Sequence, residues 1–201
     1  MKVNDLGGKV VTISGPDGYI YDEEGISGEK IDFMVEMRGR GDNRVEAYLE
    51  KYPNAVFHKG KSVWEVKVDV AIPCATQNEL HEDDAKKLIA NGVICVTEAA
   101  NMPSTLGAIK EFLNAKVLFA PGKAANAGGV AASGLEMPQN SIRLNWTSEE
   151  VDTRLKEIMV GIHNQCKKYG ADGEGYVNYV KGANIAGFVK VADAMLAQGV
   201  V

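Results

Sequence analysis

Short apolar runs rich in β-branched residues alternate with segments of helical spacing along most of this 201-residue chain. The clearest runs are residues 68–72, 93–97 and 117–120, and helical patterns separate them. Strands that are joined through helices run parallel, and helices usually cover both faces of a parallel sheet. The pattern therefore predicts an α/β fold with a mostly parallel sheet.

The start of the chain extends this pattern. Residues 9–14 form a further predicted strand, which ends at the turn sequence Gly15-Pro16-Asp17-Gly18. Proline fixes φ and glycine accepts positive φ, so these residues favour a turn. Spacing predicts helices over residues 31–38 and 45–51, and residues 55–58 favour a short strand.

Helix signals become stronger toward the end of the chain. A helix is predicted over residues 83–91, and Ser104 or Thr105 can cap the next one. Thr147 and Glu150 form a capping box before a long apolar periodicity, and a glycine-rich joint at 170–175 precedes a final helix. We expect two parts: a dinucleotide-binding, Rossmann-like region over residues 1–146 and a helical segment over 147–201 that packs on it.

Composition excludes several classes of protein. The formal net charge is −5 and no basic stripe exists to meet phosphates, which argues against nucleic-acid binding. Cys74 and Cys95 lie in apolar runs and are expected to be buried thiols of a reducing compartment. No metal-ligand spacing, membrane-spanning run or secretory signal is present, so we expect a cytoplasmic protein without a metal.

Polar clusters follow the predicted strands. They comprise residues 14–17, 74–78, 98–101 and 122–126. In an open parallel sheet, ligands bind at the carboxyl ends of the strands, so these clusters favour a nucleotide lying across that edge. The glycine-rich phosphate turn of such sites, G-x-G-x-x-G, is missing from the sequence.

The segment 126–140 places Gly128 and Gly129 at the start of a helix-like run that carries Ser133. Each glycine costs a helix about 1 kcal/mol relative to alanine. Glycines are useful where a ligand approaches the backbone at a helix start. A close contact between two helices is the alternative explanation.

Three motifs, in one register, carry a family resemblance. They are Pro73-Cys-Ala-Thr-Gln-Asn78, Glu98-Ala-Ala-Asn-Met-Pro-Ser-Thr105 and the segment 126–140, Asn-Ala-Gly-Gly-Val-Ala-Ala-Ser-Gly-Leu-Glu-Met-Pro-Gln-Asn. With them the chain resembles hexameric glutamate dehydrogenase, from about residue 6 to residue 201. The resemblance implies a doubly wound cofactor domain that lacks its first strand and glycine-rich turn, because the chain begins in the following helix.

The resemblance also implies roles for particular residues. Ala75 and Thr76 lie beside the cofactor ribose in this family, and Asn101 and Asn126 contact the nicotinamide side. Ser133 corresponds to the serine that binds the distal carboxylate of glutamate or 2-oxoglutarate, although a helical serine can instead bond its own backbone. The catalytic lysines and aspartate belong to a domain outside this chain. Gly15, Pro16 and Asp17 follow the predicted strand at the adenine side.

Asp17 favours NAD over NADP, because a carboxylate accepts a bond from a 2′-hydroxyl and repels a 2′-phosphate. We also expect no serine or basic group near Asp17 that could bind a 2′-phosphate. The alternative interpretation is that Asp17 is an exposed turn residue that binds no ligand.

The implied activity is reversible oxidative deamination of glutamate to 2-oxoglutarate and ammonia, with the isolated chain inactive. A non-catalytic nucleotide-binding module and a structural fragment are the alternatives. Family members form homohexamers; this chain is expected to be a monomer or to self-associate through open sheet edges, unless residues 9–14 pair with residues 68–72.

Overall fold

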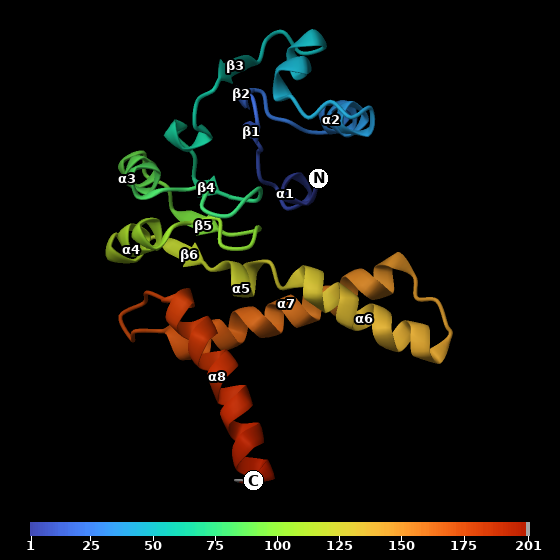
Figure 1. The fold of residues 1–201 in the computed structure, drawn as a ribbon, viewed down its shortest axis with the longest axis vertical. Helices are drawn as coiled ribbons and strands as arrows, with labels where there is room; N and C mark the ends of the chain where they lie inside the picture. The colour runs from blue at the N-terminus through green and yellow to red at the C-terminus, as the bar shows by residue number, and fades with distance from the viewer. Residues whose placement is uncertain (200–201) are drawn as a thin grey trace. The chain divides into compact units, whose positions relative to one another are not determined.

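The computed structural model describes residues 1–199 (Figure 1). The chain divides into two compact units, an N-terminal unit, Met1–Val66, and a C-terminal unit, Lys67–Val201. Each unit has its own three-stranded sheet. The result is a mixed α/β structure with a small parallel sheet and C-terminal helices.

The N-terminal unit is built on an antiparallel sheet with strand order β1-β2-β3. Its elements are α1 (Lys2–Asp5), β1 (Thr12–Gly15), β2 (Gly18–Tyr21), α2 (Glu29–Gly39), the 3-10 helix η1 (Val45–Glu50), β3 (Val56–Lys59) and the 3-10 helix η2 (Val63–Glu65).

The predicted turn at residues 15–18 is the tip of a hairpin, in which Gly15 pairs with Gly18. Gly18 has φ +145°, and a Cβ there would overlap the carbonyl oxygen of His58 on β3, so only glycine fits. The turn therefore returns the chain as β2, a strand that the sequence analysis missed. The expectation of one mostly parallel sheet is wrong for this half of the strands.

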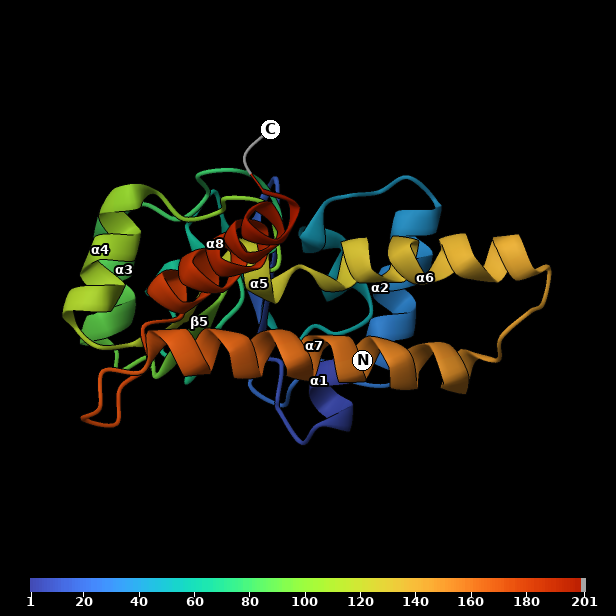
Figure 2. The same ribbon diagram turned by 90° about the horizontal axis from the view of Figure 1, so that it is seen from below.

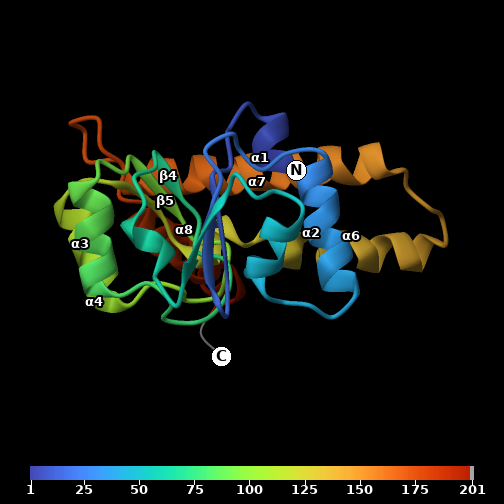
Figure 3. The ribbon, with the colours of Figure 1, turned by 90° about the horizontal axis from the view of Figure 1, so that it is seen from above.

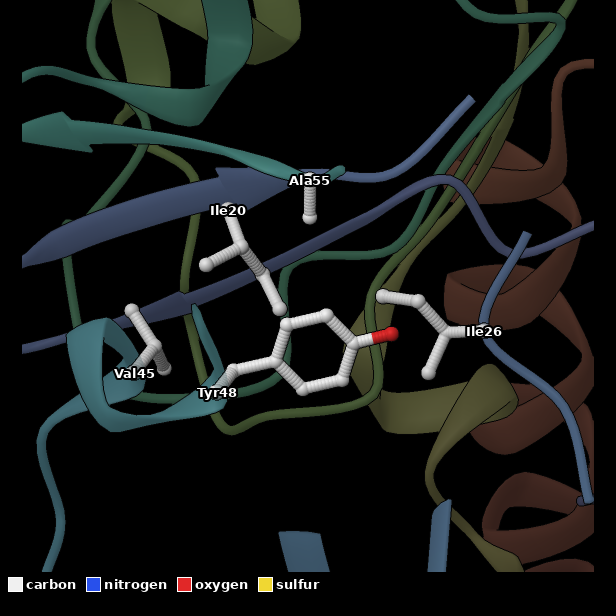
Figure 4. Packing of buried hydrophobic residues seen from close by; sticks show 5 residues of the cluster. All are labelled: Ile20, Ile26, Val45, Tyr48 and Ala55. Atoms are coloured by element: carbon white, nitrogen blue, oxygen red, sulfur yellow. The ribbon is translucent and has the colours of Figure 1, made fainter. Parts of the chain in front are cut away.

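The core of the N-terminal unit lies beneath β2. Ile20, Ile26 and Tyr48 are almost completely buried, and Val45 and Ala55 complete the cluster (Figure 4). Because the inward face of a short sheet must be covered by apolar area, η1 packs on the strands through the first and fourth of its residues, Val45 and Tyr48.

A buried carboxylate also lies in this core. Asp22, 4% exposed, accepts hydrogen bonds from the Tyr48 hydroxyl at 2.7 Å and the Lys30 ammonium at 2.8 Å. Burial acts to raise the pKa of Asp22, but the bonds from Lys30 and Tyr48 outweigh it and hold the pKa below its ordinary value. The charge is thus paired and bonded, as burial requires.

The C-terminal unit alternates strands and helices and then continues as helices alone. Its elements are β4 (Val70–Ala71), α3 (Glu82–Ala90), β5 (Cys95–Thr97), α4 (Leu106–Asn114), β6 (Leu118–Ala120), α5 (Gly122–Ala125), α6 (Gly128–Ile142), α7 (Ser148–Gly170) and α8 (Tyr179–Gln198).

The three strands of this unit are parallel, in the order β4-β5-β6. Ala71, Val96 and Phe119 share one register row and are buried, and Phe119 stacks on Phe112 of α4. Helices α3 and α4 lie side by side (Figure 3). One face of this sheet is therefore packed.

The other face is less covered. Val70 and Leu118, each 46% exposed, lie in the register row beside Cys95. The expectation that helices cover both faces holds only in part, because α8 contacts the sheet at its edge strand, β6.

Helices α6 and α7 run side by side, and α7 packs against α8 (Figure 2). The capping box at Thr147 and Glu150 begins α7 as predicted. A Cβ on Gly182 of α8 would overlap the carbonyl oxygen of Cys166 on α7, so glycine sets the closest approach of these two helices.

The structure differs from the sequence-based expectations in the pairing of the first strand and in the burial of two cysteines. Strand β1 pairs with β2, and no pairing of residues 9–14 with residues 68–72 exists in the described part of the chain. Cys74 is exposed, because it follows β4 in an edge loop and not in the sheet; Cys95 is half-buried. No helix among residues 1–199 is both long and apolar enough to cross a membrane.

Candidate functional site

The loops that follow β4 and β5 lie side by side at the carboxyl edge of the parallel sheet. The carbonyl oxygen of Pro73 accepts hydrogen bonds from the amides of Ala99 and Ala100, at 3.0 and 3.3 Å. Further along, the Leu80 amide donates to the carbonyl of Pro103. Two of the polar clusters predicted from the sequence are thus joined through their backbones.

Two non-glycine residues in these loops adopt left-handed backbone conformations. Asn78 has φ +55° and Met102 has φ +53°, and the Asn78 amide donates to the Met102 carbonyl at 2.9 Å. Asparagine tolerates this region, but methionine does so at a cost of order 1 kcal/mol. Met102 directly follows the predicted site residue Asn101, which places backbone strain at this edge.

Glu98, at the end of β5, connects this region to the next loop. The residue is 4% exposed; Oε1 accepts from the Ser104 backbone amide at 3.2 Å, and Oε2 accepts from the Gly122 backbone amide at 2.6 Å. A Cβ on Gly122 would lie 2.9 Å from the carbonyl oxygen of Ala100, so the start of α5 closely approaches the β5 loop.

Asn101 and Asn126, both predicted as cofactor contacts, form a pair. Nδ2 of Asn126 donates to Oδ1 of Asn101 at 2.6 Å and to the carbonyl of Ala100 at 3.2 Å. The other polar atoms of the two side chains, Nδ2 of Asn101 and Oδ1 of Asn126, make no hydrogen bond within residues 1–199. The pair therefore presents one donor group, Nδ2 of Asn101, and one acceptor oxygen, Oδ1 of Asn126, which ribose hydroxyls and a nicotinamide carboxamide can use.

Ala75 and Thr76 lie on the exposed loop after β4. The Ala75 amide donates to Oε1 of Glu79 at 2.8 Å, which closes this loop on itself. Within residues 1–199, no hydrogen bond joins either residue to the asparagine pair, so their role beside a ribose stays a prediction.

Ser133 is exposed on α6, about 7.5 Å along the helix from its first residue. Its hydroxyl lies 3.3 Å from the carbonyl of Gly129 and donates to it, which is the backbone bond considered as the alternative. The structure gives no contact between Ser133 and the asparagine pair.

The two glycines at the start of α6 are not required by helix packing. A Cβ on Gly128 would make ordinary contacts of 3.8 and 3.9 Å with Met159 and Leu155 of α7, and a Cβ on Gly129 would meet nothing within 4 Å. A tight helix–helix contact therefore does not explain them, and the approach of a ligand remains as a reason.

Gly15, Pro16 and Asp17 form the hairpin tip of the N-terminal unit. Asp17 has a structural role there, because its two carboxylate oxygens accept from the amides of Val45 and Glu46, each at 3.0 Å, at the start of η1. The expectation that no basic group lies near Asp17 is wrong, because Arg44 directly precedes Val45. The pKa of Arg44 is raised mainly by Asp42, and the charge of Asp17 contributes to a smaller extent. Arg44 is itself held by Asp42 through two hydrogen bonds.

Among the described residues, no group of three or more His, Cys, Asp or Glu side chains could hold an ion. Lys123 of α5 donates to Oδ1 of Asn184 on α8 at 2.5 Å and so joins α5 to the last helix.

The sequence profile of the Glutamate/Leucine/Phenylalanine/Valine dehydrogenase family matches residues 1–199. The chain belongs to this family. The three motifs at residues 73–78, 98–105 and 126–140 all lie inside the matched part, and they include the asparagine pair.

Relatives of this family are similar over the full chain. NAD-specific glutamate dehydrogenase of Bacteroides fragilis is 60% identical over 200 residues, which are 100% of this chain and 45% of that protein. NADP-specific glutamate dehydrogenase of Haemophilus influenzae is 57% identical, over 99% of this chain and 44% of that protein. The chain thus spans about half the length of the relatives that it matches.

Solved structures agree with this assignment. Plasmodium falciparum glutamate dehydrogenase superposes with a TM-score of 0.94 at 42% identity, over 100% of this chain and 43% of the other. A second glutamate dehydrogenase structure gives a TM-score of 0.93 at 49% identity, over 100% of this chain and 45% of the other.

Proposed function

We propose that this chain is the dinucleotide-binding part of a glutamate dehydrogenase that uses NAD. The observation that carries the proposal is the Asn101–Asn126 pair, which lies where the loops of β5 and β6 meet and offers a free donor and a free acceptor. The similarity to glutamate dehydrogenases over the whole chain supports the same function.

The chain's own residues bind and orient. Asn101 and Asn126 hold the nicotinamide ribose and fix which face of the ring meets the substrate, and Ala75 and Thr76 line the ribose on the neighbouring loop. When bound, the nicotinamide accepts or donates the hydride, while the protein supplies position and electrostatics. Positioning of this kind is worth several kcal/mol of the barrier.

Ser133 binds the distal carboxylate of glutamate or 2-oxoglutarate in this proposal. Its hydroxyl has one proton, which now goes to the carbonyl of Gly129 at 3.3 Å. That bond is long, and a rotation about χ1 can turn the hydroxyl toward a carboxylate, which makes a stronger, charge-assisted acceptor. The open space at Gly129 leaves room for substrate beside this turn of α6.

Gly15, Pro16 and Asp17 receive the adenine-side ribose, and Asp17 favours NAD. Each carboxylate oxygen has two lone pairs, and only one on each is used by the amides of Val45 and Glu46. The negative charge of Asp17 opposes a 2′-phosphate, and Arg44 is occupied by Asp42.

The complete reaction is the reversible oxidative deamination of L-glutamate to 2-oxoglutarate and ammonia, in a homohexamer that includes the rest of the relatives' length. We assign nucleotide binding to a Rossmann-like region over residues 1–146, with 147–201 as a helical segment that packs on it. The chain alone contains no residue in the position of the family's proton-transfer groups and is expected to be inactive.

A titration of NADH into the purified chain tests this proposal. We expect saturable binding that is about tenfold weaker in Asn126→Ala, the loss of about 1.4 kcal/mol from the bonds of one carboxamide. Asn114→Ala, at the end of α4, is the matched control and should bind as the unchanged chain does.

Two results would contradict it. If NADH does not bind, or if Asn126→Ala binds as well as the control, the structural-fragment alternative is preferred. Separately, NADH formation from glutamate and NAD at about 1–1000 turnovers per second would refute the expectation that the chain alone is inactive.

A further inference from the structure

Glu98 occupies an unusual position for a charged side chain. It lies at the carboxyl end of the central strand β5, it is 4% exposed, and each of its two oxygens accepts one backbone N–H. The two donors belong to different loops: Ser104 ends the loop after β5, and Gly122 begins α5 after β6. The strands before these loops pair as far as Glu98, whose own amide donates to the Ala120 carbonyl at 3.0 Å, and the Glu98 carboxylate joins the chain segments beyond that point.

These loops carry the two asparagines. Asn101 lies between Glu98 and Ser104, and Asn126 directly follows α5, one helical turn after Gly122. The backbone N–H of Asn126 also donates to the carbonyl of Gly122, at 2.8 Å. A shift of Gly122 away from Glu98 is thus transmitted to Asn126 through a single turn of helix.

The backbone at Gly122 lies so close to the loop after β5 that its position is closely restricted. A Cβ on Gly122 would lie 2.9 Å from the Ala100 carbonyl oxygen and 3.3 Å from Oε2 of Glu98. The same Ala100 carbonyl accepts a bond from the Asn126 side chain. The backbone approach and the carboxamide pair therefore depend on the same few atoms.

We propose that Glu98 is a positioning residue: by bonding the Ser104 and Gly122 amides, its carboxylate sets the separation of the two loops at which Asn101 and Asn126 pair. This rests on the proposed function for its consequence in nucleotide binding. Glu98 itself is buried and offers no atom to a ligand, so it acts through the asparagines.

The change Glu98→Gln isolates this effect. Glutamine has the same size and keeps one oxygen acceptor, but its amide group is a donor and cannot accept from the second N–H. One of the two bonds is lost and a buried donor is left facing another donor. The loops are then free to separate while the strands keep their packing.

The readout is the side-chain amide of Asn126 in nitrogen–proton NMR spectra of the full chain. In the unchanged chain, its two protons should be protected from solvent exchange and shifted away from those of the exposed Asn114. In Glu98→Gln, we expect exchange about tenfold faster, equivalent to about 1.4 kcal/mol of lost protection, with shifts moving toward those of Asn114.

Three further variants separate positioning from general stability. Phe112→Leu weakens the packed face of the same sheet and should leave the Asn126 amide unchanged. Ser104→Ala removes a buried hydroxyl that has no hydrogen-bond partner among residues 1–199, and it keeps the backbone N–H, so it should also leave the signal unchanged. Glu157→Gln makes the same charge change on the exposed surface of α7.

The outcomes are decisive in both directions. The proposal is overturned if Glu98→Gln leaves the Asn126 signals unchanged, or if Phe112→Leu moves them as far. NADH titration of the same variants is the second arm: Glu98→Gln should weaken binding about tenfold and the other three should not. Failure of the unchanged chain to bind NADH counts against the proposed function alone, because the amide signals need no nucleotide.

Discussion

Replacing Lys30 with methionine should destabilise the N-terminal unit by about 3 kcal/mol, because it leaves a buried carboxylate without its counter-charge. The Lys30 ammonium lies 2.8 Å from Oδ2 of Asp22, and the two side chains are only 16% and 5% exposed. Methionine keeps most of the aliphatic stem and removes the charge. The expected loss is thus electrostatic.

The magnitude follows from the burial of the pair. Exposed ion pairs contribute about 0–1 kcal/mol, whereas breaking a buried pair from one side costs about 3–5 kcal/mol. Asp22 would keep its bonds from the Tyr48 hydroxyl and the Glu24 amide, which places the loss at the lower end of that range. The Asp22→Asn/Lys30→Met double variant should be more stable than Lys30→Met, because no buried charge remains.

Trp64 provides the assay. The chain has two tryptophans, and Trp64, 9% exposed, lies in the N-terminal unit. In a Trp146→Phe background, urea unfolding followed by tryptophan fluorescence therefore reports this unit. Lys59→Met, an exposed lysine of β3, is the matched control and should change the free energy of unfolding by less than about 0.5 kcal/mol.

The reasoning is refuted if Lys30→Met and Lys59→Met lower the free energy of unfolding equally. It is also refuted if the double variant is no more stable than Lys30→Met. Either result would mean that water or the remaining donors already satisfy Asp22.

Three further predictions concern other parts of the chain. Because the folded pKa of Asp22 is depressed, its contribution to the free energy of unfolding is fully present above its unfolded pKa of about 3.9 and is lost as the pH falls through the folded pKa. The difference in stability between the unchanged chain and Tyr48→Phe should therefore shrink below about pH 4 in urea titrations. A constant difference down to pH 2 would contradict this. Gly182→Ala should destabilise the C-terminal unit by about 1–3 kcal/mol through overlap with the Cys166 carbonyl, whereas Gly187→Ala on the open side of α8 should not; circular dichroism during urea unfolding measures both. Cys74 should react with a water-soluble thiol reagent well before Cys166, which is 2% exposed, and peptide mass spectrometry of the labelled chain gives the order.

Elements with local signals were predictable from the sequence. The capping box of Thr147 and Glu150 is confirmed, and of the two cap candidates, Ser104 and Thr105, the structure has Thr105; each cap bonds a residue three positions along the chain. The turn at Gly15-Pro16-Asp17-Gly18 was also predicted. Its returning strand was missed because Gly18–Tyr21 has no polar–apolar alternation: Tyr19 and Ile20 are both buried.

Non-local bonding explains what the sequence could not reveal. Whether two strands pair parallel or antiparallel depends on partners far along the chain, such as His58 opposite Tyr19. Glu98 belongs to one of the predicted polar clusters, but the amides that it binds lie 6 and 24 residues away along the chain, so the sequence pattern does not reveal its structural role. The resemblance implies that Asn101 and Asn126 both contact the nicotinamide side of a cofactor, which stays a prediction; the hydrogen bond between the two side chains is seen only in the structure.

The parallel sheet of the C-terminal unit has one row of buried residues, Ala71, Val96 and Phe119, beside a row that is less covered, Val70, Cys95 and Leu118. Because successive side chains of a strand point to opposite faces, mutational tolerance along these strands should alternate with a period of two. In a deep mutational scan for folded chain, polar substitutions should be depleted at the first row and accepted at Val70 and Leu118. Drift among natural variants of this fold would then be concentrated on one side of the same three strands.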